Sequence, residues 1–172
     1  MTARNALAPA LTFCLALAAF ALMSTPLAHA GKADQVTKAF KGKILISEDP
    51  LPTPDLEDTK GTIKAYKAQT LKTITGTVAD GIATWNFNFT AFVKTKPKTG
   101  NLTLEFYTDD KEKLFVADKR LSGADPNLKI LQSSVRISED ENLNRNRKYV
   151  IKLVATVGKK SVTLATTKIA TK

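Results

Sequence analysis

The feature that most constrains the fold is a two-residue alternation that runs for about a dozen residues in the middle of the chain. Apolar and mostly aromatic side chains occupy every second position, at Ala83, Trp85, Phe87, Phe89, Ala91 and Val93. Polar residues fill most positions between them. Successive side chains of a β-strand point to opposite faces of a sheet, so this pattern predicts one long strand with its aromatic face in the core.

Shorter alternating runs lie on both sides of this strand, at residues 40–47, 102–106, 113–117, 128–138, 148–157 and 161–170. Turn-forming pairs such as Asp80-Gly81 separate them at intervals of about 8–12 residues. Several short strands at this spacing are typical of an antiparallel β-sandwich. We therefore predict an all-β fold, an antiparallel β-sandwich of about seven or eight strands.

Residues 62–78 are the most ambiguous stretch, because their apolar residues fit a helix as well as a broken strand. Threonine is frequent in the second half, 70–78, and its β-branched side chain favours a strand. The sequence therefore favours a strand near the end of this stretch. It leaves residues 62–72 open between helix and strand.

The N-terminus has the features of a secretory signal peptide. Arg4 supplies a positive charge, residues 11–22 are almost wholly apolar, and Ala28-His29-Ala30 forms a small-residue cleavage site before Gly31. The apolar run is shorter than the roughly 20 residues of a membrane-spanning helix, which favours cleavage over retention as an anchor. We expect a secreted or periplasmic protein with no transmembrane segment in its mature chain.

The sequence therefore divides into three predicted parts. They are a signal peptide over residues 1–30, a flexible N-terminal lead-in over 31–39, and a single sandwich domain over 40–172. One domain of this length buries enough apolar surface to fold without disulfides or metal ions.

Cleavage would also limit the chemistry that the mature chain can perform. The only cysteine, Cys14, and the only histidine, His29, lie in the predicted signal. Without them there is no thiol nucleophile, no histidine base, no disulfide and no Cys or His ligand for zinc. The signal holds one of the 26 basic residues and none of the 16 acidic ones, so nearly all of the formal charge of +10 belongs to residues 31–172. We expect a basic exported protein that is not an enzyme and has no cofactor.

The segment 143–153 resembles part of the immunoglobulin-like and fibronectin-III-like β-sandwiches. In those domains a leucine of the preceding loop packs inward and a tyrosine begins the next strand, its hydroxyl bonding back to the loop, as Leu143 and Tyr149 are placed to do here. Trp85 resembles their core tryptophan. The resemblance implies an immunoglobulin-like fold that lacks the paired cysteines of antibody domains, and such folds have no fixed function.

Basic residues in the predicted turns are the candidate binding residues. They are Lys94, Lys96, Lys98, Arg145, Arg147, Lys148, Lys159 and Lys160. Turns that share one end of a sandwich would combine them into a positive patch that attracts an acidic polysaccharide, a lipopolysaccharide phosphate or an anionic protein. Nucleic acid is disfavoured, because the basic turns carry no aromatic residue for base stacking. The alternative is a solvated lysine-rich surface that only keeps the domain soluble.

Acidic residues gather in three further loops, near residues 48–58, 109–112 and 139–141. Calcium takes about six to eight oxygen ligands, which such loops could pool, although no EF-hand motif is present. A calcium- or carbohydrate-dependent adhesion domain is one alternative function, and a small hydrolase that uses two carboxylates is another. The leading interpretation is an exported, non-enzymatic β-sandwich that acts as a binding or structural module with a basic surface.

Overall fold

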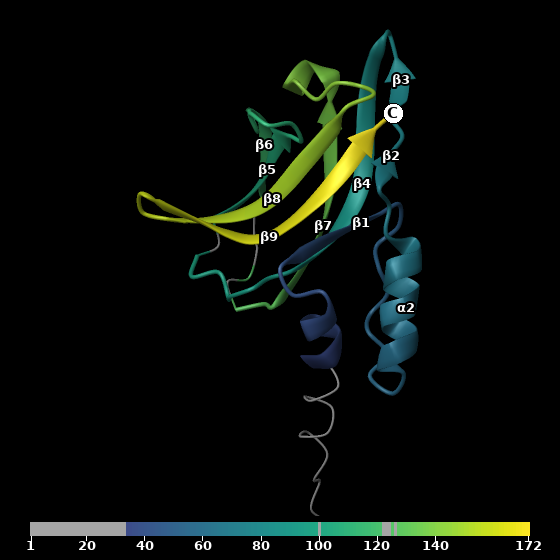
Figure 1. Cartoon of the computed structure of the whole chain (residues 1–172), viewed down its shortest axis with the longest axis vertical. Coiled ribbons are helices and arrows are strands. Elements are labelled where there is room, and N and C mark those ends of the chain that lie inside the picture. Colours follow the sequence, from purple (N-terminus) through teal and green to yellow (C-terminus); the bar gives the residue numbers. More distant parts are fainter. Residues whose placement is uncertain (1–33, 100, 122–124, 126) are drawn as a thin grey trace, which may run out of the picture.

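The structure, a computed structural model, describes residues 34–99, 101–121, 125 and 127–172. Within these residues, nine strands join into one sheet that curls into a half-barrel (Figure 1). The prediction of a mainly β protein is therefore confirmed. The predicted signal peptide and its cleavage site lie outside the described residues.

The strands are β1 (Lys43–Ser47), β2 (Thr73–Ile74), β3 (Thr77–Ala79), β4 (Ile82–Phe92), β5 (Leu102–Thr108), β6 (Phe115–Leu121), β7 (Ile130–Ser138), β8 (Lys148–Val157) and β9 (Lys160–Thr171). The helical elements are α2 (Thr59–Gln69), the 3-10 helix η1 (Glu139–Glu141) and residues 34–39. The strand order is β3-β4-β1-β9-β8-β5-β6, and off this path β7 pairs with β4 and β2 pairs with β9.

The predicted immunoglobulin-like sandwich is not confirmed, because these strands form a single sheet rather than two stacked ones. The sheet is also mixed, since β1 and β2 each run parallel to β9. Alternation in a sequence shows which side chains share a face but not which strands are neighbours. A sheet that curls around its own side chains buries the same alternating residues as a sandwich would.

The long central strand is confirmed as β4. Its inward side chains, Trp85, Phe87 and Phe89 among them, are buried in the larger of two core clusters. One edge of β4 pairs with β7 and the other with β1 and β3. The aromatic face that the sequence singles out therefore lies at the centre of the half-barrel.

A second, smaller core lies on the outer face of β1 and β4, beneath the helices. Tyr66 of α2 packs there against Phe40 and Phe92, at ring-centroid distances of 6.0 and 6.3 Å. Val36 of the helical residues 34–39 is also fully buried in it, within the segment predicted as a flexible lead-in. The helical layer thus shields one part of the outer sheet surface (Figure 1).

The stretch 62–72, which the sequence leaves open between helix and strand, is mostly helical. The predicted all-β fold contained no definite helix, so α2 is a difference from that prediction. Helix α2 begins after Asp58, whose carboxylate accepts a hydrogen bond from the Gly61 N–H at 2.8 Å and so caps the helix. The threonine-rich half that follows forms the short strands β2 and β3, as its composition favours.

Candidate functional site

Five of the predicted basic residues lie at one end of the sheet. The loop that follows β4 runs beside the β8–β9 hairpin there: the Lys94 N–H donates to the Leu164 carbonyl at 3.0 Å, and the Thr156 N–H donates to the Asn101 carbonyl at 3.3 Å. These contacts bring together the lysines of the two turns, Lys94, Lys96, Lys98, Lys159 and Lys160. All five side chains are exposed.

A sixth lysine joins this end from a third segment of the chain. The Gly42 N–H donates to the Phe92 carbonyl at 2.6 Å, which places the exposed Lys41 beside the loop after β4. Gly42 has a φ of 76°, which residues with a side chain rarely adopt, and a Cβ at this position would collide with the Lys94 side chain. Lys41 was not among the predicted binding residues because it falls inside a predicted strand.

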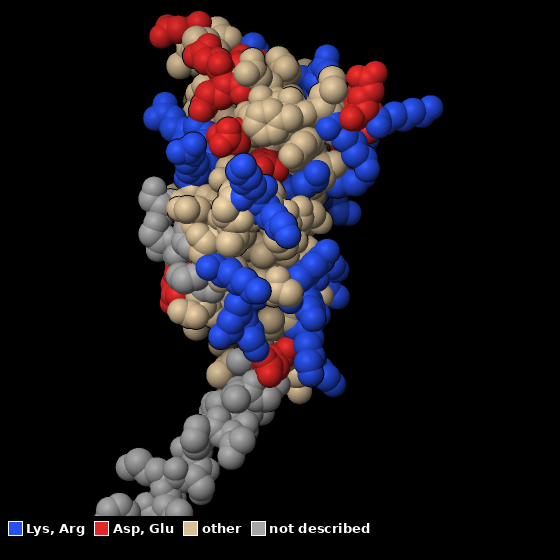
Figure 2. Space-filling model, turned by 90° about the vertical axis from the view of Figure 1, so that its left-hand side faces the viewer, with Lys and Arg blue, Asp and Glu red and all other residues tan. Residues whose placement is uncertain are grey.

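We call these six residues, Lys41, Lys94, Lys96, Lys98, Lys159 and Lys160, the basic end. Within the part of the chain that the structure describes, none of them forms an ion pair. Figure 2 shows the side of the molecule from which the β8–β9 turn projects. Lys and Arg side chains cover much of its middle and lower part, while Asp and Glu gather mainly near the top.

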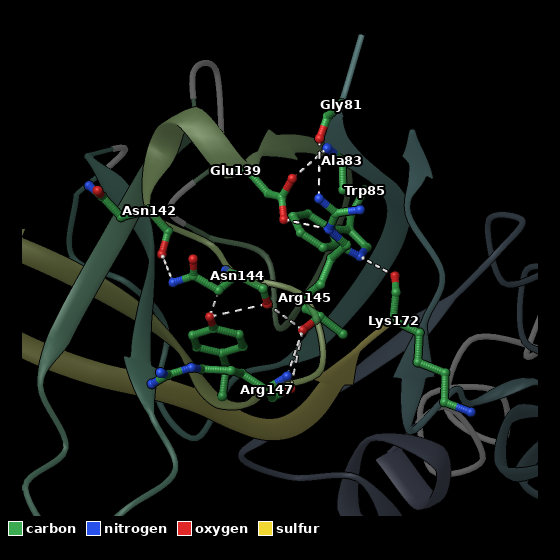
Figure 3. Close-up of polar contacts among 11 residues, drawn as sticks. Gly81, Ala83, Trp85, Glu139, Asn142, Asn144, Arg145, Arg147 and Lys172 are labelled. Carbon is green, nitrogen blue, oxygen red and sulfur yellow. Dashed lines mark hydrogen bonds and ion pairs between the residues drawn. The ribbon is translucent and has the colours of Figure 1, made fainter. Parts of the chain in front are cut away.

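The other three predicted basic residues, Arg145, Arg147 and Lys148, lie at the opposite end and do not join this cluster. The Arg145 guanidinium makes two contacts within the protein. Its Nε donates to Glu139 Oε1 at 2.7 Å and its Nη2 to the Gly81 carbonyl at 3.1 Å (Figure 3). It ties the loop before β8 to η1 and to the β3–β4 turn.

The same loop contains the corner that the immunoglobulin resemblance implies. Leu143 is fully buried, and the Tyr149 hydroxyl accepts a hydrogen bond from the Asn144 N–H at 2.8 Å. The inward packing of Leu143 and the contact of the Tyr149 hydroxyl with the loop are therefore present, but an immunoglobulin-like fold is not confirmed. Its role is to hold the start of β8 to the preceding loop.

The acidic loops use their carboxylates as internal hydrogen-bond acceptors. The Thr108 hydroxyl lowers the pKa of Asp110, the Ala83 N–H and the Arg145 guanidinium lower the pKa of Glu139, and Lys119 lowers the pKa of Glu141. Among the described residues, no group of three or more His, Cys, Asp or Glu side chains is placed to hold a metal ion.

The lowered pKa of Glu139 predicts an acid-sensitive contribution to stability. A carboxyl whose pKa is lower in the folded than in the unfolded state stabilises the fold above its unfolded pKa, and this stabilisation is lost as the pH falls through the folded value. Glu139→Gln should therefore be less stable than the unmodified chain at pH 7, and the difference should shrink below about pH 4. Urea denaturation at pH 7 and pH 3 measures both values.

Glu57→Gln is the matched control, because the Glu57 side chain is exposed and makes no hydrogen bond among the described residues. It should match the unmodified chain at both pH values. A Glu139→Gln difference that stays constant between pH 7 and pH 3 would contradict the assigned role.

No helix in the described part of the chain is long and apolar enough to cross a membrane. No protein family, curated protein or solved structure matches this chain.

Proposed function

We propose that this chain is an exported, non-enzymatic binding module that holds a polyanion at its basic end. The observation that carries the proposal is the meeting of three separate segments, residues 41–42, 93–99 and 158–160, each of which contributes exposed lysines. Export rests on the predicted signal peptide. The same prediction places the ligand in the cell envelope or outside the cell.

The arrangement of the lysines favours a ligand with repeated negative charges over a single charged group. Lysine ammonium groups act as flexible point charges rather than as a fixed bidentate fork. Several of them spread over one end of the sheet produce a positive potential over a wide surface, which attracts a chain of sulfates, phosphates or carboxylates. An acidic polysaccharide or the phosphates of lipopolysaccharide have this chemistry.

None of the acidic side chains that the structure describes forms an ion pair with the basic end, so its positive charges stay free to attract a ligand. The nearby acidic residue Asp34 already pairs with Lys129 Nζ at 3.4 Å. The rings of Phe40 and Phe92, which lie near Lys41 and Lys94 in the sequence, are buried in the smaller core and offer no surface for base stacking. These features favour a polysaccharide or lipid phosphate over single-stranded nucleic acid.

Removing four charges from the basic end tests the proposal. The variant carries Lys96→Gln, Lys98→Gln, Lys159→Gln and Lys160→Gln. We expect its affinity for heparin at about 0.15 M salt to fall at least about tenfold, or about 1.4 kcal/mol, because exposed charges act through attraction that salt screens. Salt elution from a heparin column and calorimetric titration measure the change.

The control removes four exposed lysines elsewhere, by Lys60→Gln, Lys64→Gln, Lys67→Gln and Lys111→Gln, and has the same net charge. It should elute close to the unmodified chain. Equal shifts for both variants would show that net charge alone causes retention and would overturn the proposed site. Circular dichroism verifies that both variants are folded.

A further inference from the structure

A gap interrupts the sheet between β1 and β9. The two strands pair at one position only, Lys43 with Thr166. Further along, β2 replaces β1 as the neighbour of β9, beginning with Thr73 beside Ala170. Residues 167–169 of β9 therefore face no paired strand on this side.

The gap opens into a pocket of about 610 Å³, a size typical of small-molecule sites. Apolar side chains from both cores line it. Ile44 and Ile169 belong to the larger core, Leu45 belongs to the core under α2, and Leu71 closes the far side through its N–H bond to the Ile46 carbonyl at 2.8 Å. The pocket thus offers apolar surface where the two cores meet.

Four lysines, Lys43, Lys72, Lys148 and Lys168, line the same pocket together with one carboxylate, Asp109. Lys168 Nζ neutralises that carboxylate, lying 2.8 and 3.1 Å from its two oxygens. The other three lysines form no ion pair within the described residues. The lining of the pocket therefore carries excess positive charge.

A backbone donor faces the gap as well. The Thr166 N–H donates to the Gly42 carbonyl at 3.0 Å and the Ala170 N–H to the Lys72 carbonyl at 2.9 Å, so both point away from β8. Hydrogen-bonding directions alternate along a strand, and the Lys168 N–H between them must point the same way. No strand pairs with it there, which leaves this N–H available to an anion.

We propose that this pocket binds a small amphipathic anion of the fatty-acid type, a single carboxylate on an aliphatic chain. The carboxylate would be held by the Lys168 N–H and the surrounding lysines, and the chain would lie against Leu45 and Leu71. Other ligands would use only one of the two features of the pocket. A polysaccharide has no apolar chain to contact the apolar lining, and a neutral lipid has no negative charge to interact with the lysines. The pocket shares no residue with the basic end, although Lys43 and Thr166 lie beside it, and its occupancy does not depend on the proposed polyanion binding.

Titration of the full chain with anilinonaphthalene sulfonate, itself an apolar anion, reports occupancy through fluorescence. Laurate should displace the dye, whereas dodecyltrimethylammonium, with the same chain length and the opposite charge, should displace it at least about tenfold less well. Equal displacement by the two amphiphiles would show that the pocket binds apolar chains without regard to charge, and it would overturn the proposal. Failure of laurate to displace the dye would overturn it as well.

Two variants locate the site. Ala170→Trp should fill the pocket and weaken laurate binding at least about tenfold, while Val162→Trp, at an exposed position of β9 outside the pocket, should leave binding unchanged. Should Ala170→Trp fail to fold, Lys43→Gln with Lys72→Gln tests the charge alone and should weaken laurate about tenfold. Unchanged laurate affinity in that double variant would overturn the proposal.

The four-lysine variant of the basic end should bind laurate normally. The proposed polyanion binding and the proposed laurate binding can therefore fail independently of each other.

Discussion

Trp85→Ala should lower the free energy of unfolding by about 3–5 kcal/mol, the range for removing a large aromatic side chain from a core. Trp85 lies on β4 at the centre of the half-barrel and has no exposed surface. A small domain has only about 5–15 kcal/mol of stability in total, so this loss removes a large part of it. Urea denaturation followed by far-ultraviolet circular dichroism measures the loss.

Trp85 also fastens the end of β9 to β4. Its indole Nε1–H donates to the Lys172 carbonyl at 3.0 Å (Figure 3). The Gly76 N–H donates to the same oxygen at 2.8 Å. Trp85→Phe keeps much of the ring and removes the donor, and we expect it to cost roughly 1–3 kcal/mol from the lost hydrogen bond and the smaller ring. A loss below about 1 kcal/mol for Trp85→Ala would show that the surrounding core closes around the missing ring.

The sequence predicts Trp85 well because its evidence is local. Alternation over a dozen residues is enough to assign β4 and its buried face, and no knowledge of neighbouring strands is needed. The Leu143–Tyr149 corner is local too, since its hydrogen bond spans five residues. Both were predicted correctly although the sandwich that they suggested is not confirmed.

The pocket, in contrast, has no local signature. Lys43, Lys72 and Lys168 look like ordinary outward lysines of three unconnected segments. They meet only because β2 replaces β1 beside β9, and strand exchange of this kind depends on contacts between residues far apart in the sequence. For the same reason, the turns of the basic end could be identified from the sequence, but which of them share an end could not.

The sequence does not decide between helix and strand for residues 62–72, most of which belong to α2, for a different reason. A surface helix is normally indicated by an apolar stripe, and the buried residues of α2 are only Thr59, Thr62 and Tyr66. The Asp58 carboxylate caps its N-terminus, and Tyr66 is the one aromatic side chain that anchors it to distant residues. A stripe this sparse does not distinguish a helix from an irregular strand.

This dependence on one side chain leads to the second large effect. Tyr66→Ala should cost about 3–4 kcal/mol, because the ring fills the smaller core between Phe40 and Phe92 and its hydroxyl donates to the Pro52 carbonyl. Tyr66→Phe keeps the ring and removes only the hydrogen bond, so it should cost about 1 kcal/mol. Thermal and urea denaturation compare the two.

The location of the damage separates this variant from Trp85→Ala. Tyr66 anchors α2, and α2 leads directly into Leu71 and Lys72, which close the pocket. We therefore expect faster hydrogen exchange in residues 59–72 of Tyr66→Ala, nearly unchanged exchange in β4, and weaker laurate binding with normal retention on heparin. Equal acceleration across β4 and α2 would show that the helical layer and the sheet unfold as one unit, and the pocket could not then be opened by loosening the helix alone.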